Sequence, residues 1–242
     1  MPPSIFLTGQ WKHLAMINYE IEPDALRPFV PRGTELDSWN GKTFVSLVGF
    51  MFLETRVLGL RLPFHHRFEE VNLRFYVRRK ASEGWRRGVV FIKEIVPRRA
   101  IATVARIVYN ENYVAMPMRH LIEVDDKSGR VEYGWRYRGN WNHLRVTTKG
   151  EAQTIAEGSE EEFITEHYWG YAAQRGGGSV EYQVEHPRWL VWQADSRSLD
   201  CDVKAIYGQT FADALTAEPS SAFLALGSEI IVRRGERLLY SF

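Results

Sequence analysis

The alternation of apolar and polar positions along the chain predicts a protein built mainly from β-strands. In residues 69–80, EEVNLRFYVRRK, every second position is apolar, and Glu70, Asn72 and Arg74 fall together on the opposite face. The same period-two pattern, rich in β-branched and aromatic residues, recurs along most of the first half of the chain. Strands are predicted over residues 10–21, 43–57, 65–80, 84–96 and 99–113.

Turn and capping signals divide the rest of the chain into hairpins and short helices. Asn40-Gly41 is a strong hairpin-turn signal. Ser159, with Glu162 three residues later, predicts the N-terminal cap of the best helix in the chain. Further predicted elements are hairpins over 121–139 (turning at Asp126–Gly129) and 229–242 (turning at Arg234-Gly235), a strand over 179–196, and helices over 22–31, 159–174 and 208–219.

Many strands and few helices favour a mainly β, β-rich α+β fold. The chain has 242 residues, a length that β-rich single domains often reach. It contains no fixed-period repeat, no low-complexity segment and no linker that would divide it. We therefore expect residues 1–242 to form a single antiparallel domain that is barrel-like or sandwich-like.

The net charge and the cysteine content indicate which partners the protein can bind and in which cellular compartment it is expected. The formal net charge is +1, which gives no electrostatic basis for binding nucleic acid or an anionic membrane. The single Cys201 cannot form an internal disulfide, which fits a reducing compartment. The most apolar stretch, residues 43–57, is too short for a membrane span, which needs roughly 20 apolar residues. A soluble cytoplasmic protein without nucleic-acid or membrane partners is expected.

The polar face made by Glu70, Asn72 and Arg74 has two interpretations. Base rates for charged residues favour a solvated outer face. In a closed barrel the same face would point inward, where Arg74 would hold Glu70 ionised or bind the carboxylate of a ligand. The period of the strand alone does not decide between these alternatives.

The predicted strand over residues 99–113 raises a similar question. Arg106 interrupts the apolar run IATVARIVY, and if buried it needs a partner, for which Glu70 or Glu94 is a candidate. It is either a ligand clamp or one half of a structural ion pair. The strand ends in polar and aromatic residues that form either a pocket mouth or a packed loop. The candidate ligand-binding residues of this region are Tyr109, Glu111, Tyr113 and Met118.

Other motifs give weaker indications of a functional site. His65, His66, Glu69 and Glu70 are close in sequence, but adjacent strand residues face opposite ways, and no second cluster has metal-ligand spacing. We predict neither a metal nor another cofactor. Cys201 is either a buried core thiol or a reactive one; its neighbours Asp200 and Asp202 would raise its pKa, so an inert thiol is expected.

Several segments in order resemble the YqjF-like family of uncharacterised proteins, which is placed in the acetoacetate decarboxylase-like superfamily. They are LRPFVPRGTELDSWNGKTFVSLVGF, HHRFEEVNLRFYV, RGVVFIKEIVPRRAIATVARIVYNENY and YGWRYRG. The resemblance runs through most of the chain, roughly from Trp11 to Tyr240. It implies a cone-shaped antiparallel barrel with a few short helices, a small-molecule pocket inside the cone, and often a homo-oligomer.

The chain also departs from the acetoacetate decarboxylase pattern at the position of the reactive lysine. The conserved glutamate of acetoacetate decarboxylases falls on Glu70. Those enzymes form a Schiff base through a lysine beside a second lysine, whereas here Pro117 is followed by Met118 and Arg119. Arginine stays protonated and cannot form the imine, so Schiff-base decarboxylation is not expected.

Two functional interpretations follow. In the first, the protein binds a small organic acid or carbonyl compound, with Arg74 or Arg106 pairing the carboxylate and Glu70 as an acid/base. Enolisation, hydration or isomerisation without a covalent lysine would fit such a site. In the second, the chain is a non-catalytic binding or protein-interaction module that keeps the barrel.

Overall fold

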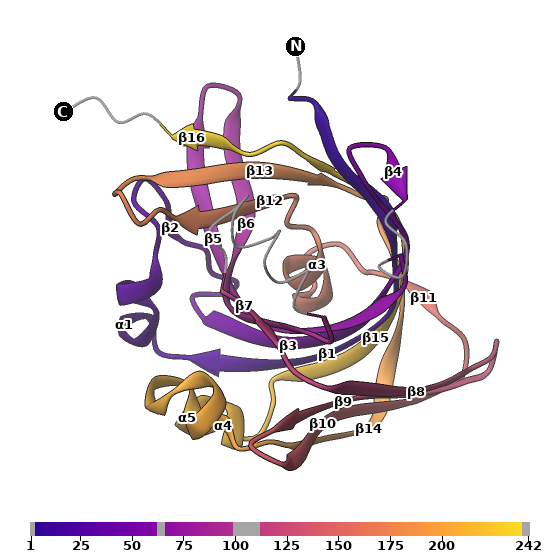
Figure 1. Cartoon of the computed structure of the whole chain (residues 1–242). Coiled ribbons are helices and arrows are strands. Elements are labelled where there is room, and N and C mark those ends of the chain that lie inside the picture. The colour runs from indigo at the N-terminus through magenta and orange to yellow at the C-terminus, as the bar shows by residue number, and fades with distance from the viewer. Residues whose placement is uncertain (1–2, 62–65, 99–111, 239–242) are drawn as a thin grey trace.

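The computed structural model describes residues 3–61, 66–98 and 112–238, and most of them lie in β-strands (Figure 1). One set of strands closes into a barrel through hydrogen bonds between neighbours in the order β13-β12-β6-β5-β3-β1-β15, with β13 also pairing with β15. Most of these pairs are antiparallel, and β12 runs parallel to β6. The barrel strands are β1 (Ile5–Ile21), β3 (Thr43–Val57), β5 (Phe68–Ala81), β6 (Gly84–Val96), β12 (Trp169–Ala173), β13 (Ser179–Glu185) and β15 (Ser221–Arg233).

A second layer of strands packs against the outside of the barrel. β14 pairs with β15 and then diverges to pair with β10, so the sheet continues outward (Figure 1). A large apolar cluster fills the space between this layer and the outward face of β1, β3 and β5. The outer strands are β14 (Leu190–Asp200), β10 (Asn140–Lys149), β9 (Ser128–Tyr137) and β8 (Met118–Val124).

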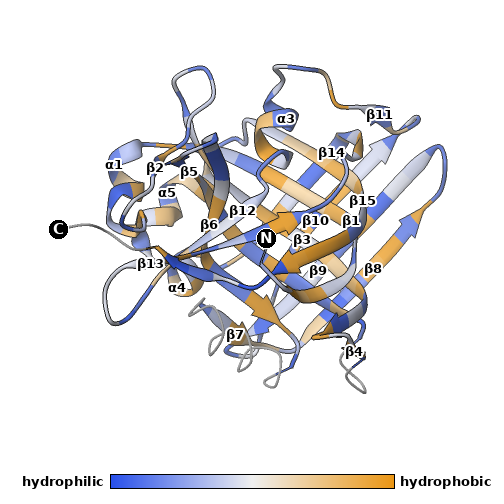
Figure 2. Cartoon of the chain, turned by 90° about the horizontal axis from the view of Figure 1, so that it is seen from above, coloured by the Kyte–Doolittle hydropathy of each residue, from blue (hydrophilic) through white to orange (hydrophobic). Residues whose placement is uncertain are grey.

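The remaining elements are short. α3 lies within the ring of barrel strands, whereas α1, α4 and α5 lie outside it (Figure 1). In Figure 2 the hydrophobic positions are concentrated along β1, β3 and α3. The short elements are α1 (Pro23–Leu26), a 3-10 helix η1 (Arg27–Phe29), α3 (Glu160–Thr165), α4 (Val203–Tyr207), α5 (Gln209–Thr216), β2 (Glu35–Leu36), β4 (Leu60–Arg61), β7 (Tyr113–Ala115), β11 (Gln153–Thr154) and β16 (Glu236–Leu238).

A β-bulge in β1 brings the barrel strands β1 and β15 into close contact. The register of β1 against β3 shifts between Lys12 and Ala15, and His13 adopts a positive φ of 56°. Opposite the bulge, Gly227 has φ 73°, and a Cβ atom there would lie 2.0 Å from the carbonyl oxygen of Trp11. Only glycine fits this position, because both the backbone angle and the space exclude a side chain.

Most of the predicted elements are confirmed, and the mainly β fold is as expected. The strand over 43–57 has its predicted bounds, and Asn40-Gly41 forms the turn between Trp39 and Lys42. The 121–139 hairpin is also present, with its turn between Asp125 and Ser128, one residue earlier than expected. The strand predicted over 99–113 lies almost wholly outside the described residues.

Three predictions were wrong for the same physical reason. The helix predicted over 159–174 ends at Thr165, and Trp169–Ala173 is strand β12, because its backbone pairs with β13 and β6. The single strand predicted over 179–196 is two strands, because β13 pairs with β12 whereas β14 pairs with β15 and β10. The C-terminal hairpin is also wrong, since β16 pairs with β13 rather than with β15. Pairing between strands overrode local preference in each place.

We predict that Gly227→Ala lowers the unfolding free energy by about 3 kcal/mol, from the positive φ together with the clash at Trp11. Gly150→Ala is the matched control, because Gly150 has φ 79° but nothing within 4 Å of an added Cβ. It should cost about 1 kcal/mol, the part due to φ alone. Urea unfolding of both variants measures the difference. Equal losses of unfolding free energy would show that an added Cβ at position 227 meets no steric clash between β15 and β1.

Candidate functional site

The polar face of β5 points into the barrel. Glu70, Asn72 and Arg74 are buried, with 2%, 2% and 9% of their surface exposed. They alternate with apolar residues that pack toward the outer layer, so both faces of β5 are covered. The solvated outer face that base rates favoured is therefore excluded.

Neighbouring strands place one more acid and an apolar border beside these residues. Glu94 on β6 is opposite Asn72 in the strand register and is 1% exposed. On β3, Phe50 is opposite Glu70 and Ser46 is opposite Arg74. The polar patch on the inner wall therefore meets apolar Phe50 beside Glu70. Beside Arg74 it continues into Ser46, which is hydrogen-bonded to Asn18 and Tyr76.

Glu70 is held by two hydrogen-bond donors in a buried environment. The Asn72 amide donates to Oε1 at 3.0 Å, and the Tyr113 hydroxyl donates to Oε2 at 3.2 Å. Burial raises the pKa of Glu70 to about 7, although these hydrogen bonds and the charge of Arg74 act to lower it. The carboxyl group therefore exchanges a proton near neutral pH.

Arg74 is buried with few partners of its own. Its Nη2 donates to the carbonyl oxygen of Ile164 at 3.3 Å, and its guanidinium lies 5.8 Å from the centre of the Tyr76 ring. Its Nε is buried without a hydrogen-bond partner, and so is Oδ1 of Asn72. Among the described residues Arg74 makes no ion pair, although a buried cation normally has one.

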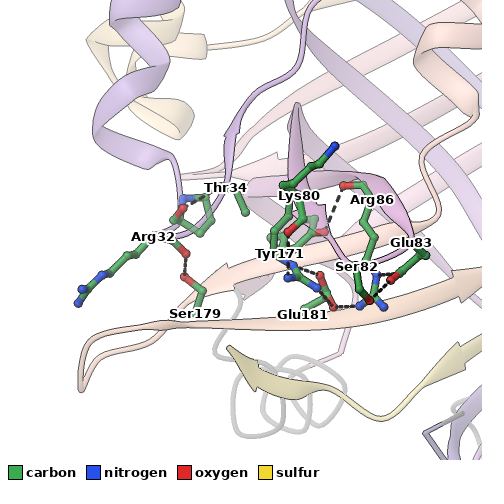
Figure 3. Close-up of polar contacts among 11 residues, drawn as sticks. Arg32, Thr34, Lys80, Ser82, Glu83, Arg86, Tyr171, Ser179 and Glu181 are labelled. Carbon is green, nitrogen blue, oxygen red and sulfur yellow. Dashed lines mark hydrogen bonds and ion pairs between the residues drawn. The ribbon is translucent and has the colours of Figure 1, made fainter. Parts of the chain in front are cut away.

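Unlike Arg74, the arginines around Glu181 form ion pairs. At the end of the β5–β6 hairpin, Arg79 and Arg86 both pair with Glu181, which is 5% exposed. Arg86 also pairs with Glu83, and Figure 3 shows Arg86 with Glu181 and Glu83. The Arg79 contact is bidentate, at 2.6 and 3.0 Å. These charges are satisfied within the protein, which fits a structural role in joining the hairpin to β13.

The helix α3 closes the barrel interior beside Arg74. Ser159 caps it as predicted, accepting a hydrogen bond from the Glu162 backbone N–H at 3.2 Å. Glu160 accepts hydrogen bonds from Ser220 and Ser221 at 2.8 and 2.6 Å, which ties the helix to β15 and the turn before it. This anchoring presents the Ile164 carbonyl to the guanidinium.

A second buried cluster lies next to α3 and was not found from the sequence. His167 Nε2 is 3.2 Å from Asp37 Oδ2, and Arg87 Nε donates to the same oxygen at 2.7 Å. Burial alone would raise the pKa of Asp37, but hydrogen bonds from His167 and Arg87 lower it to about 2. Burial lowers the pKa of His167 to about 4 despite the nearby carboxylate. No sequence pattern joins these residues, because His167 and Asp37 are 130 positions apart.

Aromatic rings line the inner wall on the other side of Glu70. Phe52 stacks on Phe68 with ring centres 4.7 Å apart, and Trp11 contacts Phe50 edge-on at 5.5 Å. Trp11 is also 6.4 Å from Trp189. The polar patch therefore lies between an aromatic group and α3.

Comparison with known proteins shows which family the chain belongs to. A family model described as an uncharacterized conserved protein, DUF2071, matches residues 8–229. The chain belongs to the DUF2071 family. It is 25% identical over 202 residues to the uncharacterized protein YqjF of Bacillus subtilis strain 168, covering 81% of this chain and 79% of that protein.

Solved structures show that this DUF2071 chain has an acetoacetate decarboxylase-like fold. The enduracididine biosynthesis enzyme MppR complexed with pyruvate superposes with a TM-score of 0.67 at 13% identity, over 99% of this chain and 92% of that one. Acetoacetate decarboxylase from Legionella pneumophila gives a TM-score of 0.64 at 12% identity, over 98% and 89%. An acetoacetate decarboxylase-like enzyme from Sphingomonas wittichii gives 0.65 at 13%, over 97% and 94%.

The other candidate residues fall in different places. Tyr113 lies at the patch, where its hydroxyl donates to Glu70. Met118 packs with the apolar cluster on the opposite, outward face of the sheet, so it is not brought together with Glu70. Arg106, Tyr109 and Glu111 lie outside the described residues. The roles assigned to all of these residues stay predictions.

Cys201 lies away from the barrel interior. It lines a cavity of about 580 Å³ beside β14, β1 and the end of α5. Burial, with smaller effects of Asp202 and Asp200, raises its pKa to about 12, in the direction the sequence predicted. Within the described residues, no three His, Cys, Asp or Glu side chains are grouped as metal ligands. No helix in that part of the chain has both the length and the apolar character needed to cross a bilayer.

We predict that Glu70→Gln becomes more stable relative to the wild type as the pH rises. The folded-state pKa of Glu70, about 7, lies above the ordinary value of 4.5. Its stabilising contribution is therefore complete below about pH 4.5 and is lost as the pH rises to 7. Glutamine mimics the protonated acid, so the free-energy difference should grow by about 3 kcal/mol across this range.

Urea unfolding between pH 4 and pH 9 measures this difference. The control is Glu229→Gln, on an exposed position of β15. Its curve should run parallel to that of the wild type. A Glu70→Gln difference that stays level through pH 7 would contradict a buried carboxyl group with a raised pKa.

Proposed function

We propose that the interior of the barrel binds a small organic acid or carbonyl compound, with Arg74 pairing the ligand's carboxylate. The observation that carries this proposal is the burial of the Arg74 guanidinium. Among the described residues it has one hydrogen-bond acceptor, the backbone carbonyl of Ile164, and its Nε has no partner. A buried cation without an ion pair is costly, and a bound carboxylate would remove that cost.

Glu70 is the proposed acid/base of the site. With a pKa near 7, both its protonated and its ionised forms are populated at neutral pH, which is the condition for efficient proton transfer. The ligand carboxylate would lie on Arg74, so a carbon next to a carbonyl group could reach Glu70 on the same strand face. Enolisation, hydration or isomerisation are the reaction types this arrangement fits.

The proposed chemistry does not use an imine. Lys93 is the lysine of β6, and it is opposite Leu73 in the strand register, on the outward face. There it donates to the carbonyl oxygen of Ile206 in α4. Together with Met118 and Arg119 after Pro117, this placement supports a reaction, or simple binding, without a Schiff base.

The structural neighbours support the class of ligand. MppR has been solved with pyruvate and with the condensation product of pyruvate and imidazole 4-carboxaldehyde. Both are small carbonyl or acid compounds of the proposed kind. The missing lysine pair favours the second candidate function, a binding module without catalysis. Cytoplasmic location, a single domain and assembly as a homo-oligomer also stay predictions.

The test is a thermal-shift screen of small carboxylic, 2-oxo and 3-oxo acids. A ligand present at 100 times its Kd adds about 2.7 kcal/mol of stability. For a chain of this length the melting temperature should then rise by roughly 5–10 °C. We expect at least one acid to give such a shift, and Arg74→Met to weaken its binding about tenfold to hundredfold.

The matched control is Arg145→Met. Arg145 lies on β10 in the outer layer and pairs with Glu132 at 2.8 Å, so its loss should leave ligand affinity unchanged. If no acid shifts the well-folded wild type, the proposed site is wrong. If an acid binds equally well to Arg74→Met, the carboxylate is held elsewhere.

A further inference from the structure

His167 has one ring nitrogen that accepts no hydrogen bond from the part of the chain that the structure describes. The side chain is 1% exposed, and Nδ1 is buried without a hydrogen-bond partner. Its other nitrogen, Nε2, lies 3.2 Å from Asp37. A buried polar atom without a partner is destabilising, so such an atom calls for an explanation.

The surroundings of His167 determine which nitrogen carries the proton. Asp37 is ionised, because Arg87 donates to Oδ2 at 2.7 Å and the Ser38 backbone N–H donates to Oδ1 at 3.0 Å. A carboxylate only accepts hydrogen bonds, so Nε2 of His167 must be the donor. Burial keeps the imidazole neutral, and Nδ1 is therefore a lone-pair acceptor.

Packing fixes the ring of His167, and Tyr76 is a neighbour of both His167 and Arg74. The ring centre of His167 lies 4.7 Å from that of Tyr76 and 5.1 Å from that of Phe163. The same Tyr76 ring lies 5.8 Å from the guanidinium of Arg74. Arg74 is also near enough to His167 and to Glu70 for its positive charge to lower the pKa of each.

The unpartnered atoms of this interior are of two kinds. Arg74 offers a donor, and it suits a carboxylate. Nδ1 of His167 and Oδ1 of Asn72 are acceptors, and neither has a hydrogen-bond donor among the described residues. A hydroxyl group supplies such a donor, whereas the carbonyl group of an oxo acid does not.

We propose that His167, oriented by Asp37, is a specificity-determining residue whose Nδ1 accepts a hydrogen bond from a ligand hydroxyl, so that the site takes hydroxy acids in preference to the matching oxo acids. This inference rests on the function proposed above. It adds the chemical group beside the carboxylate and assigns the residue that selects it. Asp37 and Arg87 act through His167 as positioning residues.

The test compares two matched pairs of acids by calorimetric titration: lactate with pyruvate, and mandelate with phenylglyoxylate. We expect the hydroxy acid of at least one pair to bind the wild type about tenfold more tightly, because the oxo acid leaves the Nδ1 acceptor unpaired. In His167→Phe this preference should fall to within about twofold, with the Kd of the oxo acid little changed. His167→Gln, whose amide oxygen accepts, should restore part of it.

His143→Phe is the control variant. His143 lies on β10 in the outer layer, 3.5 Å from Asp200, and its loss should leave the preference intact. Asp37→Ala supplies a second readout, because it removes the acceptor that holds the ring proton on Nε2. The preference for the hydroxy acid should then fall, since Nδ1 is no longer fixed as the acceptor.

A measurement on the wild type avoids any variant that fails to fold. The ¹⁵N resonance of the unprotonated His167 Nδ1 should move on adding the hydroxy acid and stay in place with the oxo acid. Oxo acids that bind as tightly as hydroxy acids, or a preference kept in His167→Phe, would overturn the inference and leave the proposed function standing. Failure of every acid to bind would overturn both.

Discussion

The guanidinium of Arg74 is buried inside the barrel without an ion pair among the described residues, and the proposed site depends on what surrounds it. Removing such a charge from water costs several kcal/mol unless hydrogen bonds and nearby charges compensate. Here the compensation is partial: the Ile164 carbonyl, the face of Tyr76 and the charge of Glu70 each contribute. The unsatisfied part of Arg74 is what a bound carboxylate would complete.

The burial of Arg74 depends on how the barrel closes. Val184 on β13 pairs with Val232 on β15, and this contact joins the two ends of the curved sheet. The outer layer covers the other face of the same strands, and Tyr133 on β9 contacts the barrel through its hydrogen bond to the His13 carbonyl at 2.9 Å. With both faces of β5 covered, its polar side chains can only point into an enclosed interior.

The sequence predicted the local structure well, but it did not predict which faces of the strands lie inside the closed barrel. Period-two alternation correctly put Glu70, Asn72 and Arg74 on one face, but only the distant β13–β15 pairing shows that this face is internal. His167 and Asp37 were missed because their contact joins two loops with no shared motif. The C-terminal half of the predicted helix over 159–174 is strand for a similar reason: Gly170 accommodates the Tyr182 ring, and a Cβ would lie 2.1 Å from it.

The most direct test of the account is a ¹³C NMR titration of the Glu70 carboxyl carbon, with and without an organic acid such as pyruvate or lactate. The free protein should show a pKa near 7. A carboxylate bound at Arg74 should raise that pKa further, because it adds negative charge and offsets the charge of the guanidinium. A pKa near the ordinary value of 4.5, unchanged by either acid, would contradict a buried acid/base beside an anion-binding arginine.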